Sequence, residues 1–206
     1  KECYRVLKPG GIIRIAIPDL EKIAKNYLKY LEESLNNVPK ASEKYEWSLL
    51  EMYDQVVRNS SGGEMVDFIK DESKQVDDFL LERNGKEVQH IMDQLRVKKK
   101  PENDLGTQSK KVSYSLGDRI KSKLKRILLK DDYQKLQVAQ FRNGGEIHQW
   151  MYDRYSLKIL LQNCGFTDVQ VVSAFASSIP DWNRFELDGS NNLVRKPDSL
   201  FIEAKK

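Results

Sequence analysis

The first apolar run of the chain has the pattern of a buried strand. Residues 12–17 hold four isoleucines directly after the turn at 8–11. Pro9 cannot continue a helix, and the two glycines that follow it permit the positive φ angles of a tight turn. Both faces of the run are apolar except at Arg14, which is typical of a strand inside a covered α/β sheet. We therefore expect a helix end at 1–7, the turn, and an interior strand.

The next part of the chain, residues 20–95, has helical periodicity. Apolar residues three and four positions apart predict a first helix with one buried face. That face consists of Leu20, Ile23, Ala24, Tyr27, Leu28 and Leu31. A second pattern, 47–57, ends at the polar, glycine-containing run 59–63. Two further helices are expected at about 65–81 and 87–95.

The end of the chain returns to alternating helix and strand patterns. Residues 155–163 predict a helix that ends at Gly165, because glycine readily takes the left-handed conformation of a helix C-terminus. The valine-rich run 169–172 and the run 199–204 predict two strands. In between, residues 96–115 have the low apolar content of a linker or loop.

Charge changes this picture in one region. The chain has 206 residues, of which 39% are hydrophobic and 32% charged, and a net charge of +4. Residues 96–130 contain twelve Lys and Arg against three acidic residues, so the positive charge is concentrated there. Residues 116–136 combine that charge with an aliphatic stripe, which predicts a basic amphipathic helix.

The cysteines and the hydropathy bear on location. Cys3 and Cys164 belong to no CxxC pair or Cys/His cluster, so a reduced, cytoplasmic setting is expected, with both thiols as small core residues. No stretch approaches the length of a membrane-spanning helix. The two histidines lack matched carboxylate or cysteine spacing, so no metal site is expected.

The sequence of residues 4–19, YRVLKPGGIIRIAIPD, resembles the fifth-strand segment of class I S-adenosylmethionine-dependent methyltransferases. Two later segments, YSLKILLQNCGFTDVQVV and PDSLFIEAKK, resemble the last helix with the sixth strand and the seventh strand of the same fold. The resemblance implies an α/β, partial Rossmann-like sheet, in which the seventh strand lies antiparallel between the fifth and sixth. The outer edge of the fifth strand is expected to be bare.

Three further segments narrow the resemblance to type 11-like methyltransferases associated with surface-glycan biosynthesis. They are YEWSLLEMYDQVVRNSSGGEM, GEIHQWMYDRYSL and VRKPDSLF. The activity implied is methyl transfer from S-adenosylmethionine to an O or N of a small molecule or glycan precursor. Residues 1–206 would then be the C-terminal part of one methyltransferase domain, with a helical insertion at 20–145 as acceptor lid. The terminal helix and two strands would occupy 146–206.

The motif that holds the methyl donor is missing from this sequence. No GxGxG follows a strand: Gly10-Gly11 precedes one, and the other glycine pairs lie between helical or loop segments. We therefore expect the S-adenosylmethionine site to lie mostly outside this chain. The chain alone is expected to bind this cofactor weakly or not at all, and to be inactive alone.

His148 is the candidate general base. Its ordinary pKa near neutrality suits removal of a proton from a hydroxyl or amine during methyl transfer. It lies in the polar and aromatic run 145–154, just before the α/β pattern resumes. The equally weighted alternative is a histidine that packs or hydrogen-bonds to hold this loop.

The same run and the segments before it supply candidate acceptor-binding residues. Asp19 leaves the first strand at its carboxyl end, where ligands bind in open α/β sheets; the favoured and compatible alternative is that it caps the helix that follows. Trp150 and Tyr152 could stack on a sugar or belong to the core, and Arg154 completes this set.

A second candidate cluster lies on the helix at 47–57. Glu51, Asp54 and Arg58 share one helix face and precede a loop, 60–63, whose backbone N–H groups could approach an anion. A sugar or phosphate group could bind there. The favoured alternative is an intrahelical salt bridge beside the helix end.

The basic stretch 116–130 allows a function of another class. Lysines beside an aliphatic stripe are typical of a helix that lies on an anionic membrane surface. No aromatic residues interleave with the charge, so nucleic acid is not expected. The alternative function is therefore a non-catalytic, membrane- or partner-binding helical module in a cytoplasmic or membrane-peripheral protein. The commonest explanation remains a solvated helix packed on its own domain.

Overall fold

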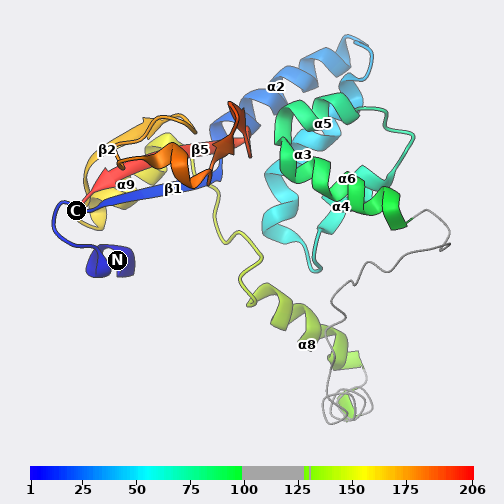
Figure 1. The fold of residues 1–206 in the computed structure, drawn as a ribbon. Helices are drawn as coiled ribbons and strands as arrows, with labels where there is room; N and C mark the ends of the chain where they lie inside the picture. The colour runs from blue at the N-terminus through cyan, green and yellow to red at the C-terminus, as the bar shows by residue number, and fades with distance from the viewer. Residues whose placement is uncertain (99–127, 130) are drawn as a thin grey trace.

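The structure, a computed structural model, describes residues 1–98, 128–129 and 131–206. The described chain is mixed α/β, with a small sheet beside a group of helices (Figure 1). The helices are α1 (Glu2–Val6), α2 (Leu20–Leu35), α3 (Ala41–Val57), α4 (Gly63–Lys70), α5 (Asp77–Asn84), α6 (Lys86–Lys98), α8 (Asp131–Arg142), α9 (Arg154–Asn163) and the 3-10 helix η1 (Trp182–Phe185). The strands are β1 (Ile12–Pro18), β2 (Thr167–Val172), β3 (Gly189–Ser190), β4 (Leu193–Val194) and β5 (Ser199–Lys205).

The three long strands form one sheet in the order β1-β5-β2. Strand β5 is antiparallel to both neighbours, and its register pairs Ile12 with Lys205 and Pro18 with Ser199. This confirms the expected strands and their order. Among the described residues no strand covers the outer edge of β1, also as expected, so β1 is an edge strand of this sheet and not the interior strand that its apolar pattern predicts.

One face of the sheet is apolar and packs against α9. Ile13, Ile15 and Ile17 of β1 lie beside Ile202 of β5 on this face, and Leu161 of α9 covers them. Helix α9 begins with a capping box. The Asp153 carboxylate accepts the backbone N–H of Ser156 at 2.7 Å, and the Ser156 hydroxyl accepts the backbone N–H of Asp153 at 3.1 Å. The predicted helix therefore forms and anchors the sheet.

The opposite face carries a buried group of charges that we call the sheet-face cluster: Arg14, Asp188 and Glu203. Arg14 pairs across the strands with Glu203 at 2.6 Å and reaches Asp188 at 2.7 Å. Its side chain and that of Glu203 are each only 4% exposed, because the segment 173–188 crosses this face. The lone charge in the apolar run is thus what lets a polar segment pack on β1.

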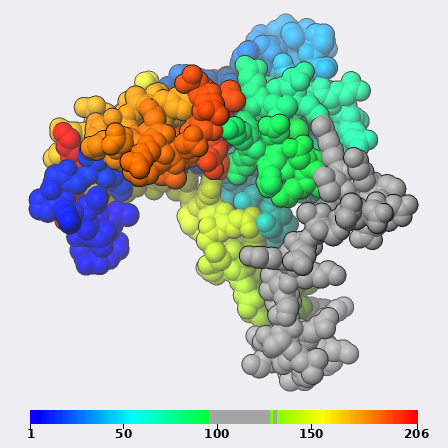
Figure 2. All heavy atoms as spheres, viewed as in Figure 1, coloured from blue at the N-terminus to red at the C-terminus, as the bar shows by residue number. Residues whose placement is uncertain are grey.

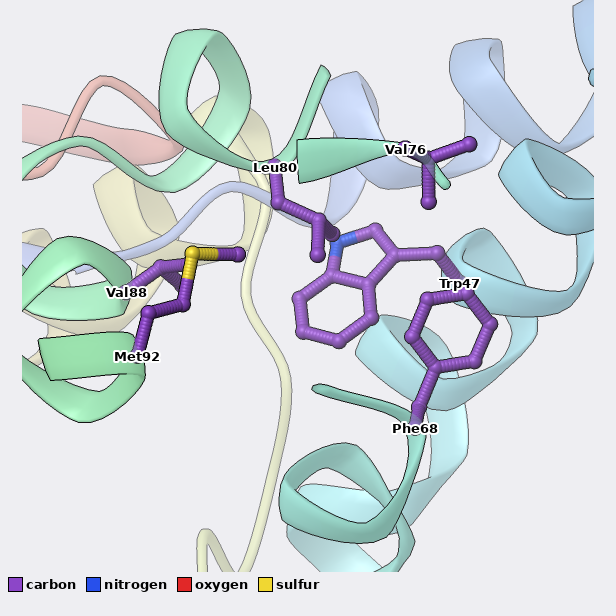
Figure 3. Packing of buried hydrophobic residues seen from close by; sticks show 6 residues of the cluster. All are labelled: Trp47, Phe68, Val76, Leu80, Val88 and Met92. Carbon is purple, nitrogen blue, oxygen red and sulfur yellow. The ribbon is translucent and has the colours of Figure 1, made fainter. Parts of the chain in front are cut away.

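The helical part has its own core around Trp47 (Figure 3). The indole is fully buried against the Phe68 ring, and its N–H donates to the Asn84 side chain at 3.1 Å. The core residues shown are Trp47, Phe68, Val76, Leu80, Val88 and Met92. The prediction of one helix over 65–81 is wrong, since α4 ends at Lys70 and α5 begins at Asp77.

Helix α2 joins the two parts. Asp19 is its N-cap and accepts the backbone N–H groups of Glu21 and Lys22 at 3.1 and 3.3 Å. Most of the predicted apolar stripe faces inward, but Leu28 is exposed and Tyr30, outside the stripe, is buried. The stripe is therefore displaced by the packing of α2 on α3.

Helix α8 returns the chain to the end of α3 and projects away from the rest of the molecule (Figure 2). Arg142 at its last turn donates to the carbonyls of Val56 and Val57, which helix α3 leaves without partners. The basic stretch 116–130 lies outside the described residues except for 128 and 129, which are helical.

The two predicted segments, 20–145 and 146–206, differ in the elements that they contain. The described residues of 20–145 contain helices and no strand, whereas 146–206 contains α9, β2 and β5 with an unexpected β3–β4 hairpin. Cys3 is exposed and Cys164 half-buried, so the expectation of two core thiols is wrong for Cys3. Over the described part of the chain, no helix is both long and apolar enough to cross a membrane.

Candidate functional site

A cavity of about 440 Å³ lies where the carboxyl end of β1 meets the helical part. Its walls are formed by the end of β1, by the helices α3, α4 and α6 with the last residue of α5, by the segment 148–152, and by the turn 196–199 before β5. Because β5 runs antiparallel to β1, its first residues lie at the same sheet edge as the last residues of β1. The size and the mixed apolar and polar walls suit a small-molecule ligand.

His148 lies on the cavity wall in an environment that favours its neutral form. Its backbone N–H donates to the Gln55 carbonyl of α3 at 3.0 Å, which fixes the residue. Burial lowers the pKa of His148, and the positive charges of Arg58 and Lys196 lower it further. No described residue hydrogen-bonds the ring, so the imidazole is available to accept a proton from a ligand.

Arg58 ends α3 and also lines the cavity. Its guanidinium contacts Glu146 at 3.2 Å and Asp54 at 3.8 Å. Its Nε is enclosed and has no hydrogen-bond partner in the described chain. Arg58 is therefore held in place by two carboxylates while one donor is left for another group.

Trp150 and Tyr152 both line the cavity but differ in setting. Trp150 is 67% exposed, which is unusual for so large an aromatic side chain. Tyr152 packs against the apolar core of the sheet, and its backbone carbonyl accepts the Leu20 N–H at 3.1 Å. Trp150 is thus the one of the two that is free to stack on a ligand, whereas Tyr152 would have to leave the core to do so.

Asp54 and the loop after α3 do not form the anion site considered from the sequence. Asp54 accepts the Glu64 N–H at 2.9 Å, and Glu146 accepts the Gly62 N–H at 3.4 Å. A side chain on Gly63 would meet the Asp54 carboxylate, so this glycine is needed for the close approach. The chain's own carboxylates thus bind two backbone amides at this loop, those of Gly62 and Glu64. The Asp54–Arg58 pair is the intrahelical salt bridge of the alternative interpretation.

Glu51 is structural as well. It is 2% exposed and accepts from the Asn84 amide at 2.9 Å and from Arg83 at 3.2 Å, both on α5. Burial raises the pKa of Glu51, against the opposing effects of Arg83 and Asn84. It is not among the residues that line the cavity.

Asp19 and Arg154 also lie away from the cavity walls. The Asp19 carboxylate is used as the cap of α2, and Arg154 forms an ion pair with Glu21 of α2 at 2.9 Å. Both residues therefore tie α2 to its neighbours. Of the predicted site residues, the cavity brings together His148, Arg58, Trp150 and Tyr152.

Three charged residues of the cavity were missed from the sequence: Glu87, Lys196 and Asp198. Lys196 and Glu87 form an ion pair between the turn before β5 and α6, and each side chain is about half exposed. One signal could have found the pair Lys196 and Asp198. An antiparallel neighbour of β1 must begin where β1 ends, so the residues before β5 had to lie at the ligand edge of the sheet.

The cavity combines a neutral base with hydrogen-bonding groups of both kinds, and this arrangement can deprotonate and orient a polar ligand. Among the described residues no group of three or more His, Cys, Asp or Glu is placed to hold a metal ion. No family model matches the chain, and no curated protein or solved structure matches it either.

Proposed function

We propose that this chain forms the acceptor-binding part of an S-adenosylmethionine-dependent methyltransferase, with methyl transfer to an O or N of a small molecule or glycan precursor. The observation that carries the proposal is the position of His148. A histidine with a lowered pKa lines a cavity at the carboxyl end of β1, where ligands bind in open α/β sheets.

Two further observations support the proposal. The order β1-β5-β2, with β5 antiparallel, agrees with the order that the resemblance implies for the fifth, seventh and sixth strands. The helices between β1 and α9 supply one side of the cavity, which is the role proposed for the insertion as an acceptor lid.

The described residues do not fit the methyl donor. Gly10 and Gly11 precede β1 and turn toward the last residue of the chain, since the Gly10 N–H donates to the Lys206 carbonyl at 3.0 Å. At Gly62-Gly63, Glu146 already accepts the Gly62 N–H and Asp54 the adjacent Glu64 N–H, and Gly144-Gly145 follows helix α8 instead of a strand. We therefore assign the donor site to residues outside the described chain.

The residues of this chain act on the acceptor. The cavity walls bind and orient it, and Trp150 shields it from water on one side. A ring nitrogen of His148 takes the proton of the acceptor hydroxyl or amine as its oxygen or nitrogen is methylated. The lowered pKa keeps His148 in the neutral form that this step requires.

The test uses the protein expressed from its complete coding sequence. It is incubated with methyl-labelled S-adenosylmethionine and a panel of monosaccharides, nucleotide sugars and amines, and label transfer is measured. Acceptor-dependent transfer supports the proposal. Absence of S-adenosylmethionine binding by that protein, measured by calorimetry, contradicts it.

A further inference from the structure

The turn that carries Asp198 is fixed on both sides. The Ser199 N–H donates to the Lys196 carbonyl at 3.1 Å, which closes a β-turn around Pro197 and Asp198. The Asp19 N–H donates to the Asp198 carbonyl at 3.1 Å, and the Lys22 ammonium to the Ser199 carbonyl at 3.0 Å. The backbone of Asp198 is therefore held in one position at the cavity wall.

The carboxylate of Asp198, in contrast, has few partners. Its Oδ1 is enclosed and makes no hydrogen bond, and no ion pair reaches the carboxylate from the described residues. Burial raises the pKa of Asp198, although the positive charges of Arg83 and Lys196 and the residue's own backbone N–H act in the opposite direction. Glu51, a buried carboxylate nearby, has both an amide and a guanidinium as donors. Proteins normally satisfy buried polar groups, so an unsatisfied, rigidly held carboxylate on a cavity wall indicates a missing ligand.

We propose that Asp198 binds the ligand of this cavity, and that the ligand is a sugar whose hydroxyl groups donate to the Asp198 carboxylate while an apolar ring face stacks on Trp150. This inference rests on the proposed function in one respect: it names the class of the acceptor.

The hydrogen-bonding groups of the cavity favour a sugar over other ligands. The Arg58 Nε lacks an acceptor and the Asp198 Oδ1 lacks a donor. The lowered pKa of His148 favours the neutral form of its ring. A hydroxyl both donates and accepts, so a ligand with several hydroxyls can satisfy groups of each kind. An inorganic anion could serve only the donors. The exposed indole of Trp150 adds the apolar surface that a sugar ring face needs.

The experiment measures binding without any methyl donor. Saturation-transfer difference NMR is recorded on the protein expressed from its complete coding sequence with glucose, galactose, mannose, cyclohexanol and inorganic phosphate. At least one sugar is expected to bind and cyclohexanol is not. Asp198→Asn should weaken sugar binding at least about tenfold, as the loss of a charge-assisted hydrogen bond does. It should also raise the melting temperature by roughly 2–4 °C, because it removes a buried, unsatisfied charge.

The matched control is Asp188→Asn, a carboxylate of the sheet-face cluster that lies outside the cavity. Asp188 is bound by Arg14, so this variant should lower the melting temperature and leave sugar binding unchanged. The proposal is overturned if Asp198→Asn fails to fold or loses stability, if sugar binding survives it, or if none of the sugars binds, including where phosphate does.

The two proposals fail separately. Sugar binding through Asp198 in a protein that does not bind S-adenosylmethionine would support the ligand and contradict methyl transfer. Methyl transfer to a non-sugar acceptor would do the reverse.

Discussion

The sheet-face cluster and the cavity both place charged side chains out of water, but they differ in how many hydrogen-bond partners these side chains have. In the sheet-face cluster Arg14 donates to Asp188, to Glu203 and to three backbone carbonyls of the segment 173–176. Glu203 accepts from Arg14, from the Ser177 hydroxyl and from the Ser178 N–H. In the cavity, the Arg58 Nε and the Asp198 Oδ1 have no partner in the described chain.

The pKa directions of two carboxyls agree with this difference. Burial tends to raise the pKa of Glu203, but the hydrogen bonds from Ser177, Ser178 and Arg14 outweigh it, and the pKa is lowered. At Asp198 burial prevails and the pKa is raised. The same physical cost is therefore compensated within the chain at one place and left for a ligand at the other. Substitutions in the sheet-face cluster should affect stability, and those in the cavity should affect function.

The largest expected effect is on stability, at Arg14. Arg14→Met leaves two buried carboxylates without their counter-charge, which destabilises proteins by about 3–5 kcal/mol. Urea unfolding measures this loss. The control is Arg5→Met, which removes an ion pair with Glu2 whose side chains are 71% and 73% exposed, and such pairs contribute little. Equal losses in the two variants would contradict the role given to the sheet-face cluster.

The second effect is on turnover. His148→Gln should lower methyl transfer by about 10²–10³-fold, since a positioned general base contributes that much, while unfolding changes little. In the wild type, activity should rise with pH as His148 loses its proton, and the midpoint of this rise should lie below the ordinary histidine pKa of about 6.5, because its pKa is lowered. Unchanged turnover in the variant would favour the alternative, in which His148 only holds the loop.

An intermediate effect should appear at Gly85, which lies between α5 and α6 and packs against the turn that carries Asp198. Gly85 has φ +64°, and a Cβ there would lie 2.7 Å from the Pro197 ring and 2.8 Å from the Arg195 carbonyl. Gly85→Ala should cost about 1–3 kcal/mol and displace the turn that carries Asp198. Urea unfolding and sugar binding measure both consequences.

The control for Gly85 is Gly145→Ala. Gly145 also has a positive φ, but its Cβ would meet nothing within 4 Å. It should cost about 1 kcal/mol from backbone conformation alone and leave binding unchanged. If the two variants behave alike, close packing of Gly85 on the turn is not what positions Asp198.

The smallest effect is the pH dependence of Asp198→Asn. The charged groups that face Asp198 are Glu51 of α3, Arg83 of α5, Glu87 of α6 and Lys196 of its own turn. Its pKa is raised in the folded protein, so its contribution to stability is favourable below the unfolded pKa and is lost as the pH rises through the folded pKa. The stabilisation by Asn should therefore be larger at pH 8 than at pH 4 in thermal unfolding. A gain that grows toward low pH would contradict the raised pKa.

Much of the fold could be predicted because its signals are local. The isoleucine run and the terminal strands have β-branched patterns, and Pro9 and Gly165 mark the turns beside them. The break between α4 and α5 could not be found from apolar spacing. Asp71 ends α4 by accepting from both the N–H and the hydroxyl of Ser73, and this local turn competes with the helix.

The site was less accessible because its polar residues depend on distant partners. Glu51 and Asp54 lie on one helix face as predicted, yet Asn84 and the Glu64 N–H bind them. Their spacing gives no sign of those partners. Arg14 is the reverse case, since a lone charge in an apolar run is a local signal from which a polar cover could have been predicted.

The register of β1 on β5 also governs the order of assembly. The segments that meet at Pro18 and Ser199 lie far apart in sequence, whereas α3 to α6 bring together residues close in sequence. Contacts between distant segments form slowly, and early segments fold first during synthesis. The helical core can thus form before the sheet closes, and the cavity is completed only after the turn 196–199 and β5 have been made.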